Sequence, residues 1–355
     1  MHGVEALEKL AAQEFDVVLL DITMPEMDGY EVLSRMKADE QLRHIPVVMI
    51  SAIEDIESVV RCIELGADDY LPKPFNLVIL RARVSASLDK KKLRDRERLY
   101  AASLERELEI GREIQKGFFP ESIPASPGWQ IAARFEPARQ VAGDFYDAFR
   151  LEGGRTMLVI ADVCGKGVGA ALYMALFRSL LRAVATAPSA DLGPAAVLDR
   201  AARVTNDYIA TTHESSSMFA TAFLGIVDPP TGALHYINCG HEAPLVMAGG
   251  AVRARLAPTG PALGLMPGLP FAVASETVAP GESVVLFTDG VTEAVGESGF
   301  FGDERLLEVL RDPCGPVSAA LDAIVAAVRT HAAGFEPSDD ITLLALRRDG
   351  PPYQT

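Results

Sequence analysis

The sequence predicts a multi-domain protein with an α/β part at the N-terminus, a helical segment in the middle and an α+β part at the C-terminus. Three observations support this prediction. Up to Phe75, continuous apolar runs alternate with segments of helical period, which is typical of a parallel sheet covered by helices. Residues 76–117 contain no proline and are densely charged. Beyond Pro120, short β-rich runs are separated by glycine and proline turns, which is typical of antiparallel sheets.

In the first part, residues 15–20 (FDVVLL) and 45–50 (IPVVMI) have the length and composition of strands buried on both faces. Segments of helical period surround them at residues 3–13, 30–39 and 56–65. Because strands and helices alternate, we expect a parallel sheet whose ligand-binding edge lies at the carboxyl ends of its strands.

Three residues that can handle a phosphoryl group follow the apolar runs of this first part. Asp21 directly follows the first run, Ser51 directly follows the second, and Lys73 lies in LPKPF after a shorter apolar stretch. At one sheet edge, a carboxylate, a hydroxyl and an ammonium would converge. This trio suits a phosphoryl group accepted by Asp21, with Ser51 and Lys73 binding or neutralising its oxygens.

The segment DITMPEMDG, the strand-end Ser51 and the LPKPF segment resemble the motifs of response-regulator receiver domains. The resemblance implies a partial receiver over residues 1–78, with Asp21 as phospho-acceptor, Ser51 as switch hydroxyl and Lys73 as phosphate partner. It also implies a sensor histidine kinase as partner in a two-component phosphorelay. A complete receiver begins with a strand, an acidic pair that holds Mg²⁺, a helix and a second strand, and none of these is found here. We expect Met1 to be an internal methionine of a longer protein; the alternative is a degenerate receiver kept as an interaction surface.

Residues 79–117 predict a helical, coiled-coil-like linker, formed by one long helix or by two abutting helices. Its apolar positions step by three and four with one break: Leu77, Leu80, Val84, Leu88, Leu93, Tyr100 and Leu104. So narrow a stripe favours a homodimer through the linker over a solvated helical spacer. Residues 118–349 form the third part. They contain strand-like runs at 157–163, 220–228, 233–240, 283–291 and 340–348, and two amphipathic helices at 170–187 and 317–331.

Aspartates beside glycines and at strand ends recur in this third part: Asp144 in VAGDFYD, Asp162 in LVIADVCGKG, Asp289 in VVLFTDGV, and Asp339 and Asp340 in PSDDIT. Clustered carboxylates repel one another, so a fold that gathers them needs a cation. Oxygen ligands without His or Cys favour Mg²⁺ or Mn²⁺ over zinc. Two such ions about 4 Å apart can clamp a phosphoryl group for in-line attack. The alternative is that TDG and SDD are ordinary turns.

Ordered blocks within residues 109–348 resemble the PPM (PP2C-type) metal-dependent serine/threonine phosphatases, in the bacterial branch with stress-response and sporulation phosphatases. The blocks are REIQKGFFP, GDFYD, ADVCGKGVGAAL, FATAFLGIVD, NCGHEAPLV, LFTDGVTEA and SDDITLLAL. The resemblance implies a PP2C-like β-sandwich flanked by helices and two ions, Mn²⁺ or Mg²⁺.

Residue by residue, the resemblance implies that Asp162 bridges both ions. The carbonyl of Val163 and Asp144 would complete the shell of the second ion, and Asp289 and Asp339 would hold the first ion with Asp162. Asp147 and Asp340 are the nearest alternatives, expected to support the ligands. Lys166 is a weaker candidate for binding phosphate, and His241 is expected to be a satisfied loop histidine. Cys164 lacks the arginine-ended loop of a thiol phosphatase, so its thiol is expected to be a spectator.

The sequence therefore predicts a metal-dependent phosphoprotein phosphatase regulated by its receiver module. The resemblance suggests phosphoserine or phosphothreonine on a small regulatory protein, such as an anti-sigma factor antagonist, as substrate. One rival is a non-catalytic PP2C-fold scaffold that binds a partner without turnover. Another is a nucleotide cyclase, in whose chemistry the SDDIT and TDG blocks have no role.

The net charge and the cysteine pattern indicate which partners and which cellular compartment to expect. The chain has 33 Lys and Arg against 49 Asp and Glu, a net charge of −16. Such a surface repels phosphate backbones and anionic lipid, so we expect no nucleic-acid partner and no membrane association. Arg178 and Arg182 interrupt the longest apolar helix candidate, which argues against a membrane span. The four cysteines are scattered without a CxxC pair, which is typical of reduced thiols in the cytoplasm: Cys62, Cys164, Cys239 and Cys314.

Overall fold

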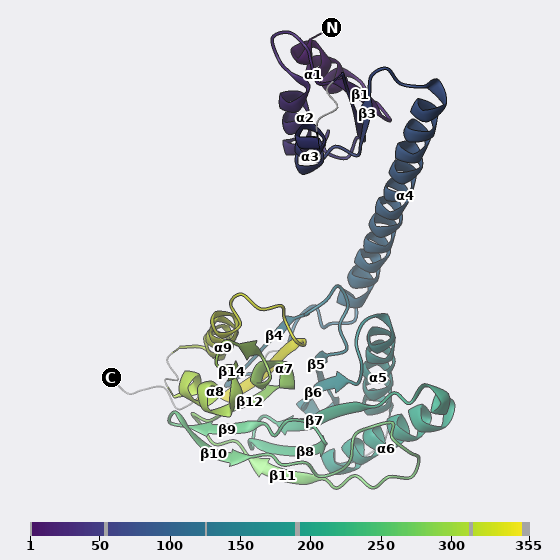
Figure 1. Cartoon of the computed structure of the whole chain (residues 1–355). Helices are drawn as coiled ribbons and strands as arrows, with labels where there is room; N and C mark the ends of the chain where they lie inside the picture. Colours follow the sequence, from purple (N-terminus) through teal and green to yellow (C-terminus); the bar gives the residue numbers. More distant parts are fainter. Residues whose placement is uncertain (1, 53–55, 125, 189–191, 312–314, 350–355) are drawn as a thin grey trace. The chain divides into compact units, whose positions relative to one another are not determined.

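The computed structural model describes residues 2–52, 56–124, 126–188, 192–311 and 315–349, so Cys314 lies outside the described residues. The chain divides into two compact units, Met1–Arg106 and Glu107–Thr355. In Figure 1 the first unit runs from purple to blue and the second from blue through green to yellow.

The N-terminal unit is built on a three-stranded parallel sheet in the order β1-β2-β3. The strands are β1 (Val18–Asp21), β2 (Val47–Ser51) and β3 (Asp69–Pro72). Every residue of β2 is buried, as expected of a central strand. Strand β1 lies at an edge of the sheet, where Leu19 is 45% exposed. The predicted parallel sheet, with strands in the two apolar runs, is confirmed.

The helices of this unit are α1 (Gly3–Ala12), α2 (Gly29–Ala38) and α3 (Ile56–Glu64). Helix α2 begins after Asp28, whose carboxylate accepts a hydrogen bond from the Glu31 amide at 2.8 Å and so caps the first turn. Leu33 and Met36 of this helix are buried with Val47 of β2 in the core of the unit.

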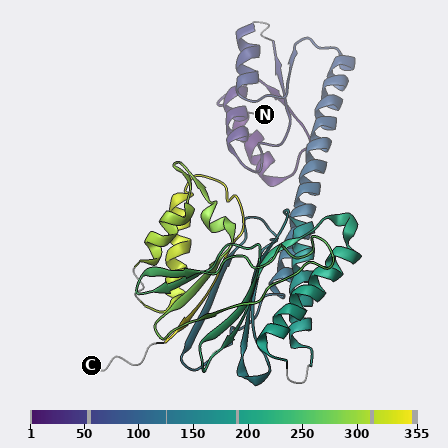
Figure 2. The same ribbon diagram turned by 90° about the horizontal axis from the view of Figure 1, so that it is seen from below.

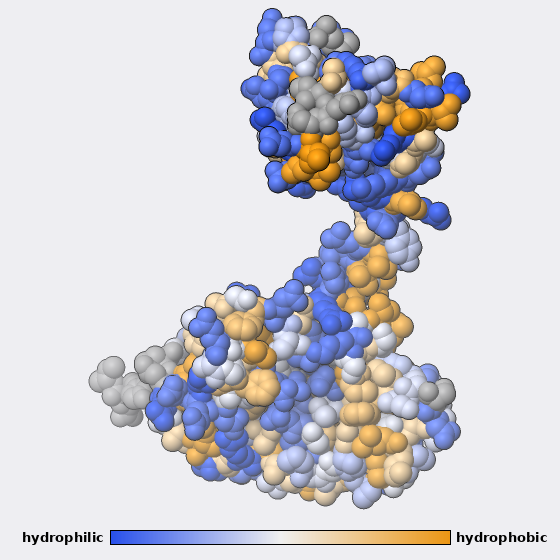
Figure 3. Space-filling view, viewed as in Figure 1, coloured by the Kyte–Doolittle hydropathy of each residue, from blue (hydrophilic) through white to orange (hydrophobic). Residues whose placement is uncertain are grey.

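A single helix, α4 (Leu77–Lys116), follows β3. In the N-terminal unit, Arg83 of α4 donates to the Asp69 carboxylate at 2.6 Å and Lys91 donates to the Asp16 carboxylate at 2.9 Å. Hydrophobic residues remain uncovered along the helix, as the orange areas on it in Figure 3 show. The exposed ones beyond Lys91 are Leu93, Leu99, Tyr100, Leu104, Ile110 and Ile114.

The C-terminal unit contains two antiparallel five-stranded sheets among its described residues. The first has the order β11-β8-β7-β6-β5 and comprises β5 (Phe145–Arg150), β6 (Thr156–Val163), β7 (Ala220–Asp228), β8 (Ala233–Cys239) and β11 (Ala274–Thr277). The second has the order β10-β9-β12-β15-β4 and comprises β4 (Trp129–Glu136), β9 (Leu245–Ala248), β10 (Ala251–Arg255), β12 (Ser283–Phe287) and β15 (Ile341–Arg348). A short hairpin joins β13 (Val295–Gly296) and β14 (Gly299–Phe300).

The two sheets pack face to face, with helices on both outer faces, as Figure 2 shows. Leu158 and Phe223 of the first sheet share a buried cluster with Leu286 and Leu344 of the second. Because β6 and β12 lie in the middle of this stack, their sequences are almost continuously apolar. The predicted sandwich flanked by helices is confirmed.

Two helices cover each outer face. Helices α5 (Val168–Thr186) and α6 (Pro194–Thr212) share a core with the first sheet, and α8 (Gly302–Leu310) and α9 (Val317–His331) share one with the second. Shorter helical turns lie at α7 (Asp289–Thr292), η1 (Glu152–Gly154) and η2 (Glu214–Ser216). The amphipathic patterns in the sequence predict α5 and α9 but neither α6 nor α8.

Within the described part of the chain, α5 alone is long and apolar enough to cross a membrane by length and composition. In this fold, Met174, Phe177 and Leu181 of α5 are buried in the core that the helix shares with the first sheet. Its two arginines, Arg178 and Arg182, form ion pairs with Asp147.

Candidate active site

In the N-terminal unit, Asp21 ends β1, Ser51 ends β2 and Lys73 directly follows β3. Because the strands are parallel, all three residues lie at one edge of the sheet. The Lys73 ammonium forms an ion pair with the Asp21 carboxylate, and the Lys73 amide donates to the Ser51 carbonyl at 2.7 Å. The Ser51 side chain is buried, whereas Asp21 and Lys73 are 35% and 41% exposed. The edge therefore offers an accessible carboxylate with a cation beside it.

In the C-terminal unit, four segments far apart in sequence bring acidic residues together. Asp144 directly precedes β5, Asp162 lies near the end of β6, Asp289 begins α7 after β12, and Asp339 lies just before β15. Their carboxylates interact electrostatically: Asp162 is affected by Asp289 and Asp339, and Asp144 by Asp162. We call these four residues the acidic cluster.

Burial and mutual repulsion disfavour the charged forms of three members of the acidic cluster. Burial, together with the charges of Asp162 and Asp340, raises the pKa of Asp144 well above its ordinary value. Burial and the nearby Asp289 and Asp339 raise the pKa of Asp162 to about 7. Burial is also the main cause that raises the pKa of Asp289. A bound cation would offset this repulsion.

Two glycines allow the backbone segments of the cluster to approach closely. A Cβ atom at Gly143 would lie 2.8 Å from the carbonyl oxygen of Val163, so the absent side chain permits the close approach of these segments beside Asp144. A Cβ atom at Gly290 would lie 2.0 Å from the carbonyl oxygen of Asp340, so only glycine permits this approach after Asp289.

Asp147 and Asp340, the alternatives to the proposed ligands, bond to the protein itself. Asp147 is 1% exposed; its carboxylate accepts two hydrogen bonds from Arg182 at 2.7 and 2.8 Å, and it lies 3.2 Å from Arg178. Asp340 accepts from the backbone amides of Ala138 at 2.8 Å and Gly143 at 3.0 Å. Asp340 thus holds the loop that leads into Asp144.

The side chains that hold Asp144 and its loop in place are not predicted by any sequence pattern. The hydroxyls of Thr288 and Thr342 each donate to one Asp144 oxygen at 2.7 Å, and both threonines are completely buried. Gln115, near the end of α4, donates to the Ala142 carbonyl at 2.7 Å and accepts from the Ala142 amide at 3.0 Å. All three lie inside the blocks that carry the resemblance, but a threonine after a strand and a glutamine in a helix carry no signal of their own.

Glu242 and Glu293 were also missed. Burial raises the pKa of Glu242, with a smaller contribution from Asp289, and the charge of Glu293 contributes to the raised pKa of Asp289. Among the cations, Lys166 lies 2.8 Å from the Asp339 carboxylate and donates to the Ser338 carbonyl at 2.6 Å.

The remaining candidates bond away from the cluster. His241 is buried, its ring lies 2.9 Å from the Thr221 hydroxyl, and burial lowers its pKa to about 4. The Cys164 sulfur accepts a hydrogen bond from the Phe219 amide at 3.3 Å.

In the parts of the chain that the structure describes, no three Asp, Glu, His or Cys side chains are already arranged to hold a metal ion. The donor set nevertheless fits a hard divalent cation. Each of the four carboxylates offers oxygen, and their mutual repulsion favours a cation. Gly143 lets the Val163 carbonyl lie close to the segment that carries Asp144. The acidic cluster in a helix-flanked β-sandwich defines a protein of the PP2C-type class.

Comparison with known proteins agrees with this class. Residues 152–349 match the family model of Stage II sporulation protein E (SpoIIE), and residues 1–85 match that of the response regulator receiver domain. The chain therefore belongs to the SpoIIE family and carries a receiver domain ahead of its PP2C-type domain.

Three relatives place the chain more closely. Protein IcfG of Synechocystis sp. is 43% identical over 267 residues, which is 68% of this chain and 42% of IcfG. The chain thus spans less than half of that relative. Phosphoserine phosphatase RsbU of Bacillus subtilis is 28% identical over 244 residues, covering 68% of this chain and 70% of RsbU. The solved SiaA-PP2C domain of Pseudomonas aeruginosa has a TM-score of 0.60 at 25% identity and covers 70% of this chain and 99% of that domain.

Proposed function

We propose that this protein is a metal-dependent phosphoprotein phosphatase that removes phosphate from a small regulatory protein. The observation that carries the proposal is the acidic cluster, whose carboxylates repel one another inside a PP2C-type fold. The similarity to phosphoserine phosphatase RsbU supports phosphoserine or phosphothreonine as the bond that is cleaved. We further propose a partner-switching pathway with an anti-sigma factor antagonist as substrate.

Two Mn²⁺ or Mg²⁺ ions would be held by Asp144, Asp162, the Val163 carbonyl, Asp289 and Asp339, and Asp162 would contribute to both. When bound, two such ions supply Lewis-acid charge that neutralises the phosphate and activates water for in-line attack. The protein's own residues hold this arrangement. Thr288 and Thr342 fix one oxygen of Asp144, and Asp340 fixes the loop before it.

The proposed domains are a partial receiver over residues 1–78, a helical linker over 79–117 and a phosphatase domain over 118–349. In the receiver, Asp21 would accept a phosphoryl group from a sensor histidine kinase, and Ser51 and Lys73 would contact its oxygens. The ion pair between Lys73 and Asp21 supports this assignment. The uncovered apolar residues of α4 support a homodimer through the linker. We place this regulation in the cytoplasm, without nucleic-acid or membrane partners.

The direct test is hydrolysis of p-nitrophenyl phosphate by the whole chain with Mn²⁺, with EDTA, and with Asp289→Asn. We expect activity that requires Mn²⁺ and falls about a thousandfold in Asp289→Asn, since a lost ligand removes several kcal/mol of transition-state stabilisation. Asp322→Asn is the matched control, because Asp322 is an exposed aspartate that pairs with Arg134 outside the cluster. Hydrolysis of phosphoserine and phosphothreonine peptides then tests the substrate class.

A second candidate function is a PP2C-fold scaffold that binds a partner without turnover. The ion pair between Lys166 and Asp339 favours it, because the lysine occupies a proposed metal ligand. Calorimetry separates the two functions. Mn²⁺ binding with no hydrolysis would contradict the catalytic proposal, and neither binding nor hydrolysis would support the scaffold.

A further inference from the structure

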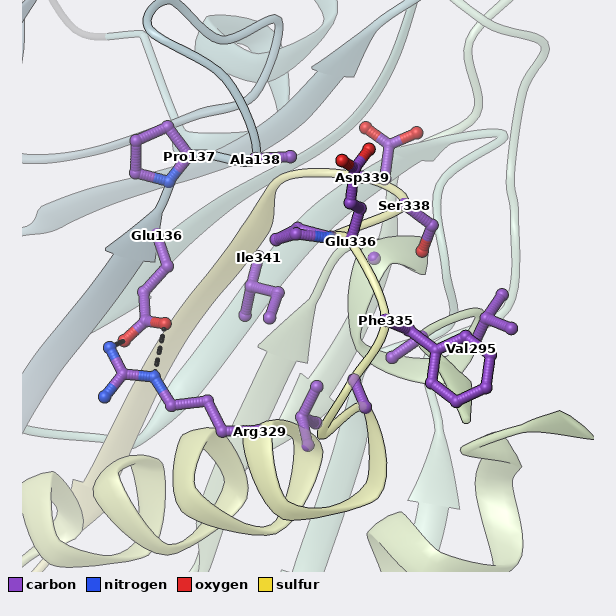
Figure 4. A pocket seen from close by; sticks show the side chains of 15 residues that line it. Glu136, Pro137, Ala138, Val295, Arg329, Phe335, Glu336, Ser338, Asp339 and Ile341 are labelled. Atoms are coloured by element: carbon purple, nitrogen blue, oxygen red, sulfur yellow. Dashed lines mark hydrogen bonds and ion pairs between the residues drawn. The ribbon is translucent and has the colours of Figure 1, made fainter. Parts of the chain in front are cut away.

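A pocket lies beside the acidic cluster, between the end of α9, residues 332–338 and α7. Its volume is about 230 Å³. Val295, Phe335 and Ile341 contribute apolar surface to it, as Figure 4 shows. Phe335 is 45% exposed although it is a large apolar side chain. We call this site the Phe335 pocket.

The Phe335 pocket shares lining residues with the acidic cluster. Asp339, a proposed metal ligand, lines it, and so does Gly290, which directly follows Asp289. Ser338 lines it too, and its carbonyl accepts a hydrogen bond from Lys166 at 2.6 Å. A substrate whose phosphate reaches the acidic cluster therefore presents its neighbouring groups to this pocket.

Charge at the pocket disfavours an acidic occupant. The one arginine among its lining residues, Arg329, is held by Glu136 through two hydrogen bonds of 2.7 and 2.9 Å, drawn as dashed lines in Figure 4. Glu336 adds a further carboxylate. Arg329 is thus already paired. Lys166, at the border of the pocket, is held by Asp339 and the Ser338 carbonyl. A carboxylate or phosphate placed here would meet the Glu136 and Glu336 carboxylates without an unpaired cation among the lining residues. An apolar group would instead cover Phe335 and its neighbours.

Size points to a side chain as the occupant. Pockets for drug-sized small molecules occupy about 300–1,000 Å³, and this pocket is smaller. The Glu136–Arg329 pair lines it, and most of its other lining residues are aliphatic or aromatic. Such a site fits one apolar side chain of a larger ligand that is bound at the neighbouring acidic cluster.

We propose that the Phe335 pocket binds an apolar side chain of the phosphoprotein substrate, carried within about three residues of the phosphorylated residue, since three extended residues span about 10 Å. This proposal rests on the phosphatase function proposed above and adds a specificity site to it. Phe335 is a specificity-determining residue in this scheme: it touches the substrate away from the reacting phosphate.

The test uses the whole chain, Mn²⁺ and a set of phosphoserine heptapeptides with alanine at all six flanking positions. In each further peptide, one alanine is replaced by leucine or by glutamate. At one flanking position we expect leucine to raise kcat/KM about tenfold over alanine and glutamate to lower it, since filling an apolar pocket discriminates by about 10–200-fold. In Phe335→Ala this leucine-to-alanine ratio falls to about one. Tyr208→Ala, which removes an exposed aromatic residue of α6 outside the pocket, keeps the wild-type ratio.

The leucine-to-alanine ratio of kcat/KM distinguishes the pocket proposal from the phosphatase proposal, because a change in overall activity affects both peptides equally and cancels. No hydrolysis of p-nitrophenyl phosphate or of any peptide by wild type would defeat the phosphatase proposal itself. Hydrolysis with a ratio near one at every position would overturn the pocket alone, as would a leucine preference that survives Phe335→Ala. Size-exclusion chromatography tests whether the pocket instead binds a second copy of this chain. If Phe335→Asp converted a dimer into a monomer, the second copy would be the occupant and the proposal would be overturned.

Discussion

Aspartates lie at strand ends in both units, but the two sites differ in the number of carboxylates and in how many of them have a cationic partner. At the edge of the N-terminal sheet, a single accessible Asp21 is paired with Lys73. In the C-terminal unit, four carboxylates lie together, and burial and repulsion raise the pKa of three of them. A single carboxylate paired with a lysine suits the reversible arrival of a phosphoryl group. Four carboxylates with one lysine among them, paired with Asp339, suit bound cations. The placement of cations therefore distinguishes two kinds of phosphate chemistry at similar strand ends.

The largest expected effect comes from neutralising Asp162 in the acidic cluster, with the same change at Asp21 of the N-terminal unit as the comparison. Asp162→Asn should lower kcat/KM for p-nitrophenyl phosphate about a thousandfold. In metal-free protein the same change should raise the midpoint of thermal unfolding by about 2–4 °C, because removing one of several repelling charges stabilises the fold by about 1 kcal/mol. Asp21→Asn should leave both quantities nearly unchanged. A loss of stability in metal-free Asp162→Asn would contradict the view that the cluster is strained by its own charge.

A second comparison lies within the C-terminal unit, between aspartates with and without protein cations. Asp147→Asn should destabilise this unit by about 3 kcal/mol, because Arg178 and Arg182 lose their buried counter-charge. Trp129 is the only tryptophan of the chain and is buried in this unit, so its fluorescence during urea unfolding reports on this unit alone. Asp322→Asn, at an exposed ion pair, should leave the urea midpoint unchanged. Equal midpoints for the two variants would mean that the Asp147 pairs are dispensable.

Much of this arrangement follows from sequence, because the strands that carry function are buried on both faces. Strands β2, β6 and β12 are recognisable as apolar runs, and Ser51, Asp162 and Asp289 lie at or next to their ends. Strands β4 and β5 mix polar and apolar residues and were not recognised. Helix α6 was missed although its sequence is strongly amphipathic.

The hydrogen bonds that hold Asp144 in place could not be predicted from the sequence, because they depend on tertiary structure. Thr288 and Thr342 become partners of Asp144 only when β12 and β15 pair, and this pairing joins residues more than fifty positions apart. The close approach at Gly290 likewise depends on the position of Asp340 in the folded sandwich. Local patterns predict where a carboxylate follows a strand. Which of these carboxylates pair with a lysine or arginine side chain depends on tertiary contacts.

A smaller effect tests how the acidic cluster is held in place. Gln115→Ala should destabilise the C-terminal unit by about 1–3 kcal/mol, because the buried amide and carbonyl of Ala142 lose their partners. It should also lower kcat for p-nitrophenyl phosphate, because Ala142 lies two residues before Asp144. Gln140→Ala, at an exposed glutamine of the same loop, is the matched control. A stability loss without any change in kcat would limit Gln115 to a structural role.

The smallest expected effect belongs to the ion pair between Asp21 and Lys73. Lys73→Met should change the stability of the N-terminal unit by less than about 1 kcal/mol, because water already screens an ion pair whose members are 35% and 41% exposed. Since this unit has no tryptophan, amide hydrogen exchange in β1 and β2 is the suitable measurement. A loss of several kcal/mol would show that Asp21 depends on Lys73 as Asp147 depends on its arginines. The contrast between the units would then lie in the number of carboxylates rather than in how their charge is balanced.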